Sequence, residues 1–183
     1  MTDEIIEGDV LVIGGGITAL RAAVSAADSG ADVVLVDKGI PSKSGGGPVA
    51  FSTIAALIEK PDSVDIFFED LMRSGEYLNN PALARILASD VADGKVLEIE
   101  KYGIIFDRLP NNKPRRYQTG GHSYPRCFGS YHTSSIADVL LLEVMRRDIC
   151  VIPEMMMAKL LTLKGAVVGA VGLNRKNGIL SRI

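Results

Sequence analysis

The sequence is poor in cysteine and histidine and has no tryptophan. It contains two histidines and two cysteines, Cys127 and Cys150, which lie far apart in the chain. Two cysteines without a CxxC pair support neither a disulfide framework nor a cysteine zinc site. We expect both to be small packed side chains in a protein of a reducing compartment, and we predict no metal site.

The sequence also lacks a charge bias and a long apolar run. Its net charge of −2 argues against binding to nucleic acid or to an anionic membrane surface. The longest stretch without a charged residue, 44–58, is too short to span a bilayer and contains glycine and proline. The first residues are acidic where a secretory signal would be basic. We therefore expect a cytoplasmic protein without a transmembrane segment, either free or peripheral on the cytoplasmic side of a membrane.

Glycine is the residue type that the sequence has in excess, with 19 of 183 residues. Hydrophobic residues make up 47% and charged residues 23%, as is usual for a soluble globular protein, and the length suits one sizeable core. We therefore treat residues 1–183 as one domain. The positions of the glycines then become the main clue.

The first forty residues predict a strand, a helix and a second strand. Residues 9–13 form a short apolar run that ends at three glycines, which is typical of a fully buried parallel strand. Residues 17–29 are alanine-rich and helical in pattern, and Gly30 suits the end of that helix. Residues 33–36 form a second buried strand, which ends at Asp37. This order predicts a βαβ unit.

The turn between the first strand and the helix fits the pattern G-x-G-x-x-G/A. Its residues are Gly14, Gly15, Gly16, Ile17, Thr18 and Ala19. The first glycine permits the tight turn, the third leaves room for a pyrophosphate beside the backbone, and the alanine lets the helix pack closely on the sheet. The pattern alone is weak, but an acidic residue, Asp37, follows about twenty residues later, where a ribose hydroxyl would need an acceptor. Together these features predict a dinucleotide site at the helix N-terminus.

A second cluster of small residues follows Asp37 and Lys38. It contains Lys43, Ser44, Gly45, Gly46 and Gly47. Small side chains there would leave clearance for a planar ring, so this segment favours FAD over NAD. The alternative is a flexible loop without a ligand.

The rest of the chain predicts helices followed by strands. We expect helices over 52–58, after Asp62, from Pro81, and from a capping box of Ser135 and Asp138 to Arg147, with a polar extended excursion over 108–131. We expect strands over 150–163 and 166–173, with Asn177-Gly178 turning the chain into a last strand from Ile179.

Four stretches resemble the flavoprotein subunits of the succinate dehydrogenase and fumarate reductase family, which includes L-aspartate oxidase. They are 9–19, 33–50, the Gly-Gly-His-Ser-Tyr-Pro-Arg segment at 120–126, and 158–178. The resemblance implies an α/β fold: an incomplete Rossmann-like FAD-binding domain, with a parallel sheet, inserted helices and a small antiparallel element.

The resemblance also implies which residues hold FAD. They are Gly14 to Ala19, Asp37, Lys38, the loop from Lys43 to Gly47, and the backbone near Met156. Many respiratory members attach FAD covalently to a histidine just after the serine that Ser44 matches. Here that position is Gly45, which has no nucleophile, so we predict non-covalent FAD.

By the same resemblance, the complete enzyme transfers a hydride between flavin N5 and a small dicarboxylate and takes part in electron transport with an iron–sulfur partner subunit. Family members are several hundred residues long, so we expect the strand that completes the nucleotide fold and the capping domain to lie in a missing C-terminal portion or partner chain. An L-aspartate oxidase-like enzyme, and a fragment without activity of its own, remain open as alternatives. No catalytic acid or base is assigned in these residues. We expect His122 and Arg126 to order their loop through backbone hydrogen bonds, the alternative being that they bind a carboxylate.

Overall fold

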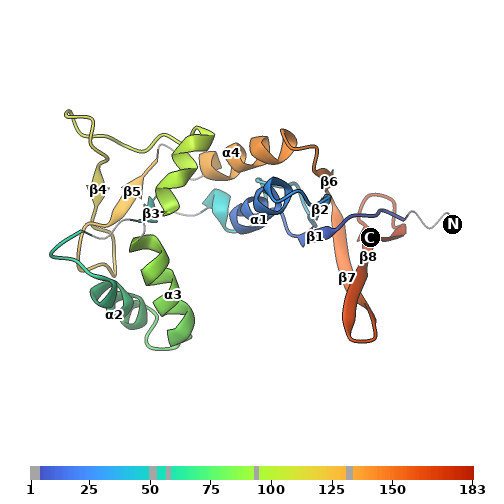
Figure 1. Cartoon of the computed structure of the whole chain (residues 1–183), viewed down its shortest axis with the longest axis horizontal. Coiled ribbons are helices and arrows are strands. Elements are labelled where there is room, and N and C mark those ends of the chain that lie inside the picture. The colour runs from blue at the N-terminus through green and yellow to red at the C-terminus, as the bar shows by residue number, and fades with distance from the viewer. Residues whose placement is uncertain (1–4, 50–52, 57–58, 93–94, 131–133) are drawn as a thin grey trace. The chain divides into compact units, whose positions relative to one another are not determined.

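The chain folds into two compact units (Figure 1). The first unit consists of Met1–Ala50 and Thr133–Ile183, and the second of Phe51–His132. The structure, a computed structural model, describes residues 5–49, 53–56, 59–92, 95–130 and 134–183.

A three-stranded parallel sheet in the order β1-β2-β6 organises the first unit. All four residues of β2 are buried because neighbouring strands flank it on both sides. The elements of the unit are β1 (Val10–Ile13), α1 (Ile17–Asp28), β2 (Val33–Val36), η1 (Gly47–Val49), α4 (Ser134–Met145), β6 (Cys150–Ile152), β7 (Met155–Leu163), β8 (Ala166–Asn174) and β9 (Leu180–Arg182). The predicted βαβ unit is confirmed, with β2 at the predicted residues.

The two faces of this sheet are covered differently. Val34 and Val36 pack with Met155 from β7 in one hydrophobic cluster. Because side chains alternate along a strand, Val33 and Leu35 point to the opposite face, where α1 packs on β1 and β2. Helix α4 packs in turn on α1. The parallel sheet therefore lies between a helical layer and an antiparallel layer, which fixes the position of the α1 N-terminus.

The antiparallel layer consists of β7, β8 and β9 in that order. Strands β7 and β8 are joined at Lys164-Gly165, both with positive φ, as a two-residue type I′ turn requires. The predicted return after Asn177-Gly178 is confirmed, with β9 starting at Leu180. The predicted strand 150–163 is interrupted at Glu154, so β6 joins the parallel sheet and β7 the antiparallel one.

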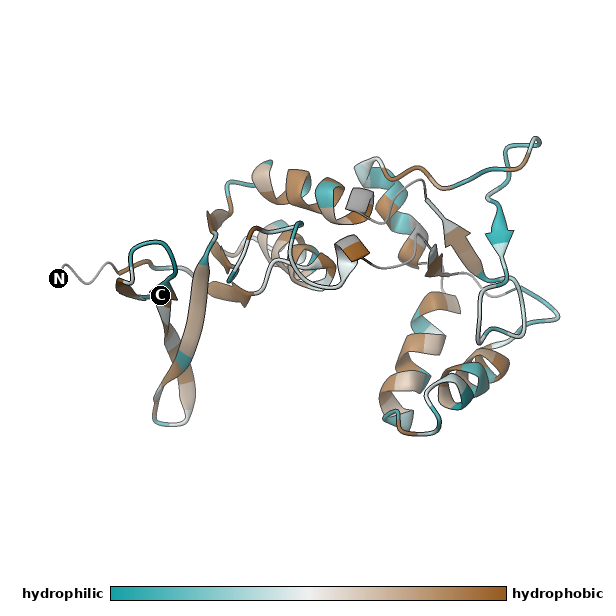
Figure 2. Ribbon diagram, turned by 180° about the vertical axis from the view of Figure 1, so that it is seen from behind, coloured by the Kyte–Doolittle hydropathy of each residue, from teal (hydrophilic) through white to brown (hydrophobic). Residues whose placement is uncertain are grey.

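The second unit packs two helices beside a small antiparallel sheet of order β3-β5-β4. Phe67, Ala88 and Val91 form the core between the helices. Figure 2 shows the central strand β5 as hydrophobic and the neighbouring edge strand β4 as hydrophilic. The elements are β3 (Thr53–Ala55), α2 (Val64–Ser74), α3 (Pro81–Ala92), η2 (Lys95–Tyr102), β4 (Arg116–Tyr117) and β5 (Cys127–Gly129).

Several local predictions were wrong. Instead of a helix over 52–58 there is a strand at 53–55, because β3 pairs with β5; residues 52, 57 and 58 lie outside the described part. Helix α2 is capped by the Ser63 hydroxyl, while Asp62 pairs with a buried arginine. Helix α4 starts at Ser134, so Ser135 is not its cap. Cys127 is buried as expected, whereas Cys150 is exposed.

Strand β1 also departs from the prediction, because it is only partly buried. Ile13 is 51% exposed. The reason is that β1 has a neighbour on one side only within the described sheet. The predicted α/β class is confirmed. Among the described helices, none is long and apolar enough to cross a membrane.

Candidate functional site: the glycine turn and the loop beside it

The site begins where β1 ends and the chain turns into α1. Gly14 has φ +119°, a conformation that side chains other than glycine rarely adopt, and its amide donates to Val36 O at 2.7 Å. A Cβ added to Gly14 would lie 3.7 Å from Ala19 Cβ. The first glycine therefore makes the turn, and the small Ala19 permits close packing of the helix, as the pattern predicts.

Gly15 and Gly16 differ in what surrounds them. A Cβ on the buried Gly15 would lie 2.7 Å from Pro41 Cα and 2.9 Å from the Asp37 carboxyl, so Gly15 permits contact with the next loop. A Cβ on Gly16 would meet no heavy atom within 4 Å. The space in front of Gly16 is thus open, and Gly16 needs no special backbone conformation, since its φ is −79°.

Gly16 is also the N-cap residue of α1, and it offers no side-chain acceptor to the helix. The first N–H groups of a helix have no partner within the helix, and together with the helix dipole they favour an anion. Thr18 is exposed in this first turn. The open face at Gly16 therefore combines a helix N-terminus that has no side-chain cap with unoccupied space where a Cβ would lie.

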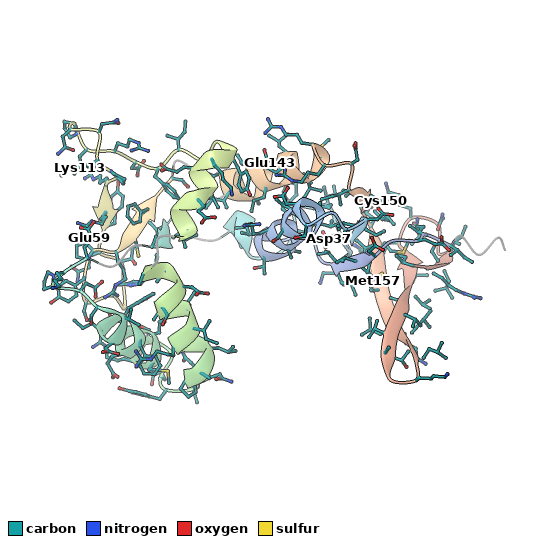
Figure 3. The ribbon with its side chains drawn as sticks, in the orientation of Figure 1. Asp37, Glu59, Lys113, Glu143, Cys150 and Met157 are labelled. Carbon is teal, nitrogen blue, oxygen red and sulfur yellow. The ribbon has the colours of Figure 1, made fainter. Side chains whose placement is uncertain are left out.

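Asp37 lies at the carboxyl end of β2, next to this turn (Figure 3). Asp37 is only 6% exposed, and its Oδ2 accepts a hydrogen bond from Ser44 Oγ at 2.5 Å. The next residue, Lys38, is exposed. Asp37 thus reaches both the glycine turn and loop 40–47, the segment that contains the second glycine cluster.

Loop 40–47 returns across the first turn of α1. A Cβ on Gly47 would lie 3.1 Å from Ile17 Cδ1, so this end of the loop rests on the helix. Gly45 has φ +88°, and a Cβ on either Gly45 or Gly46 would meet nothing within 4 Å. The loop therefore exposes bare backbone beside the open face at Gly16.

The structure adds Asp138 to this neighbourhood, a residue that sequence reasoning assigned to a capping box. Asp138 Oδ1 accepts from Ser42 Oγ at 2.8 Å and from Lys43 Nζ at 2.6 Å. The hydrogen bonds from Lys43 and Ser42 hold the pKa of the Asp138 carboxyl below its ordinary value, so it is ionised at neutral pH. No sequence signal links these residues, because about 95 positions separate them.

The segment after β6 closes the other side of Asp37. Glu154 N donates to Gly39 O, and Met155 N donates to Asp37 O, each at 2.9 Å. Met156 is 44% exposed, whereas Met155 is buried, as alternation along β7 requires. Sequence reasoning also missed Arg175, whose NH1 donates to Lys38 O at 2.7 Å. The predicted site residues of the first unit thus lie along one connected set of segments.

The Gly120–Arg126 segment belongs to the second unit and has a different environment. Arg126 is 1% exposed and forms a two-pronged ion pair with Asp62, at 2.6 and 2.8 Å, and a 2.6 Å ion pair with Asp70. Ser123 donates to Asp70 from both its amide and its hydroxyl. Arg126 therefore orders its loop through ion pairs of its side chain with two carboxylates, in addition to the backbone hydrogen bond that its carbonyl accepts from Ala56 N at 3.0 Å.

His122 is held in the same cluster. Its ring stacks on Phe67, and its Nδ1 lies 3.0 Å from an Arg126 nitrogen. Burial and the neighbouring guanidinium lower the pKa of His122, so the ring is neutral at pH 7. The positive charge of Arg126 is balanced by two buried aspartates, which leaves this pair poorly suited to bind a carboxylate.

The candidate site combines buried residues, Asp37 and Ser42, with exposed ones, Lys43, Gly45 and Gly46. A cavity of about 580 Å³ is lined by residues 5–11 and parts of β7, β8 and β9, and it includes none of the predicted site residues. Within the described residues, no group of three or more His, Cys, Asp or Glu side chains is arranged to hold a metal ion.

Comparison with known proteins gives a consistent result. A family model described as "FAD binding domain" matches residues 9–183. A subunit of the fumarate reductase (CoM/CoB) of Methanothermobacter marburgensis is 36% identical over 97% of this chain and 33% of its own length. The L-aspartate oxidase of Pyrococcus abyssi is 30% identical over 67% of this chain and 24% of its own length.

Solved structures agree with these relatives. A chain of the Mycobacterium smegmatis Sdh1 complex in its apo form matches 98% of this chain with a TM-score of 0.84 and 31% identity, over 33% of its own length. The present chain therefore spans about a third of the length of the curated relatives it matches first.

Proposed function

Because this chain belongs to the family of FAD binding domains, we propose that it holds FAD non-covalently for an oxidoreductase of the fumarate reductase and succinate dehydrogenase type. The observation that carries the proposal is the open face at Gly16, where uncapped helix donors meet a glycine-rich loop. Such an arrangement suits a dinucleotide pyrophosphate.

The residues present fit the cofactor. The pyrophosphate would lie on the α1 N-terminus beside Gly16, and Asp37 would accept from a ribose hydroxyl. Lys43 and the bare backbone of Gly45 to Gly47 would border the flavin, while Met156 would offer its backbone to the adenine. The absence of a side-chain nucleophile at Gly45 supports non-covalent binding.

FAD, when bound, supplies the hydride chemistry at flavin N5. The described residues bind and orient the cofactor, and the charges of Lys43 and Asp138 tune its surroundings. The names of the relatives support a dicarboxylate such as fumarate as substrate, and the Methanothermobacter relative is itself one subunit of a larger enzyme, which supports partner subunits here. We propose that an iron–sulfur subunit is among them and that the substrate groups lie in sequence beyond these 183 residues. A cytoplasmic location stays a prediction.

An L-aspartate oxidase-like activity is the second candidate. It is favoured by the 30% identity to the Pyrococcus abyssi enzyme, but that match covers less of the chain than the fumarate reductase match. Formation of iminoaspartate from L-aspartate would select this candidate. Co-purification of an iron–sulfur protein would select the first.

The test of FAD binding is the visible absorption spectrum of the purified protein before and after acid precipitation. We expect flavin bands that pass into the supernatant. Bands that stay with the precipitated protein would contradict the role given to Gly45. A protein that shows no flavin bands even after FAD is added would contradict the proposed function, and it would favour a fragment that binds FAD only with a partner chain.

A further inference from the structure

Ser42 occupies a strained corner of loop 40–47. It has φ +66°, which is uncommon for a non-glycine residue, and its side chain is fully buried. A left-handed residue of this kind is strained and persists where its surroundings hold it. Two hydrogen bonds do so here: Ser42 N donates to Gly15 O at 2.9 Å, and Ser42 Oγ donates to Asp138 Oδ1 at 2.8 Å.

The next residue, Lys43, is tied to the same oxygen. Its Nζ lies 2.6 Å from Asp138 Oδ1, although both side chains are partly exposed. One carboxylate of α4 thus fixes the backbone corner and balances the charge of the adjacent lysine. Helix α4 also contacts the end of the loop at η1.

Two further contacts anchor the loop, one to Asp37 and one to α1. Ser44 Oγ donates to Asp37, and Gly47 rests on Ile17 of α1. Side-chain anchors of this kind lie before and after Gly45 and Gly46, which themselves face open space. Asp138 is therefore the residue that ties the corner before these glycines to the helical layer.

We propose that Asp138 is a positioning residue of the FAD site, which clamps the Ser42–Lys43 corner in the shape that FAD requires and balances the Lys43 charge beside the flavin. This inference rests on the proposed function, because it assigns to Asp138 a role in a site whose occupant is FAD. It extends that function to a helix that neither the glycine pattern nor the resemblance includes.

The test measures the FAD dissociation constant and the flavin midpoint potential in the purified protein. Asp138→Ala removes the acceptor from both donors, and we expect FAD to bind about tenfold more weakly, as for the loss of one charge-assisted hydrogen bond. Asp138→Asn keeps an oxygen acceptor, so affinity should return to within about threefold of wild type. Its midpoint potential should become more positive, because the Lys43 charge is no longer balanced and favours the reduced, anionic flavin.

Glu143→Ala is the matched control. Glu143 is another carboxylate of α4, more buried than Asp138, and its replacement also removes ion pairs, here with Arg146 and Arg147. It makes no hydrogen bond or ion pair with loop 40–47 in the described part of the chain. We expect it to lower thermal stability and leave FAD affinity unchanged. Equal weakening by Asp138→Ala and Glu143→Ala would overturn the proposal, since the effect would then be general destabilisation of α4.

Unchanged affinity and potential in folded Asp138→Ala would also overturn it. Should Asp138→Ala not fold, Ser42→Ala, which removes only the corner hydrogen bond, is judged by the same affinity criterion, with about threefold weakening expected. Failure of the proposed function is recognised separately, because the wild-type protein itself would then bind no FAD.

Discussion

Replacement of Gly16 by aspartate should have opposite effects on ligand binding and on the stability of the fold. The added Cβ meets no atom within 4 Å, and the backbone at Gly16 has an ordinary φ, so the folded chain accommodates a side chain there. Aspartate is a favoured N-cap residue, and its charge interacts well with a helix N-terminus. We therefore expect Gly16→Asp to raise the free energy of unfolding by about 0.5–1 kcal/mol.

The same substitution should abolish FAD binding. The new carboxylate would accept hydrogen bonds from the N–H groups that the pyrophosphate needs, and its negative charge would repel the negative charge of the pyrophosphate. Two unit charges about 4 Å apart at an effective dielectric constant of about 20 repel by roughly 4 kcal/mol, which corresponds to nearly three decades in affinity. Allowing for screening by salt, we expect at least about a hundredfold increase in the dissociation constant.

The assay is titration of the apoprotein with FAD, followed by flavin fluorescence, together with urea unfolding of each variant. Ser25→Asp is the control, because it adds the same charge at an exposed position about 13 Å further along α1, beyond the Debye length. The reasoning would be refuted if Gly16→Asp stayed folded and bound FAD within threefold of wild type. It would also be refuted if both variants lost FAD equally.

Three further predictions concern the fold. Arg126→Met leaves Asp62 and Asp70 buried without their partner, so the free energy of unfolding measured with urea should fall by about 3–5 kcal/mol. A fall of less than about 1 kcal/mol would show that the fold does not need these ion pairs. Gly15→Ala should lower the free energy of unfolding by about 1–3 kcal/mol, because the added Cβ would meet the backbone of Pro41. The Cβ added by Gly46→Ala would meet no atom, so its free energy of unfolding should stay within about 0.5 kcal/mol of wild type. Equal effects of the two substitutions would contradict the contact at Gly15. Burial raises the pKa of Asp70, but hydrogen bonds from its neighbours outweigh this and leave the pKa below its ordinary value. The stability that this shift supplies is present above about pH 4 and is lost as the pH falls through the lower, folded-state pKa, so Asp70→Asn should flatten the fall of unfolding free energy on acidification; an unchanged acid profile would count against it.

Local sequence was sufficient for the elements around the glycine turn. A short apolar run, three glycines, an alanine-rich helix and a second apolar run specify a βαβ unit, because each signal acts over a few residues. Gly14 and Ala19 have the geometry that their pattern predicts. The return of the chain from β8 into β9, around Asn177-Gly178, is local in the same way.

Pairing partners that are distant in sequence were not accessible to this reasoning. Strand β3 at 53–55 exists because β5 pairs with it about 75 residues later, although its own residues suggested a helix. The sequence predicted Asp62 as a helix cap, but its carboxylate accepts hydrogen bonds from the buried Arg126 instead. In both cases a long-range interaction outweighed a local preference.

By itself, the sequence determined the dinucleotide turn, its following acid Asp37 and the absence of a nucleophile at Gly45, since these depend on residue type and short spacing. Only the tertiary structure decided what surrounds them. It brought Asp138 from α4 to the Ser42–Lys43 corner and Arg175 to the backbone of Lys38. Such contacts depend on how the helical layer and the antiparallel layer pack on the sheet. That packing cannot be predicted from any short stretch of residues.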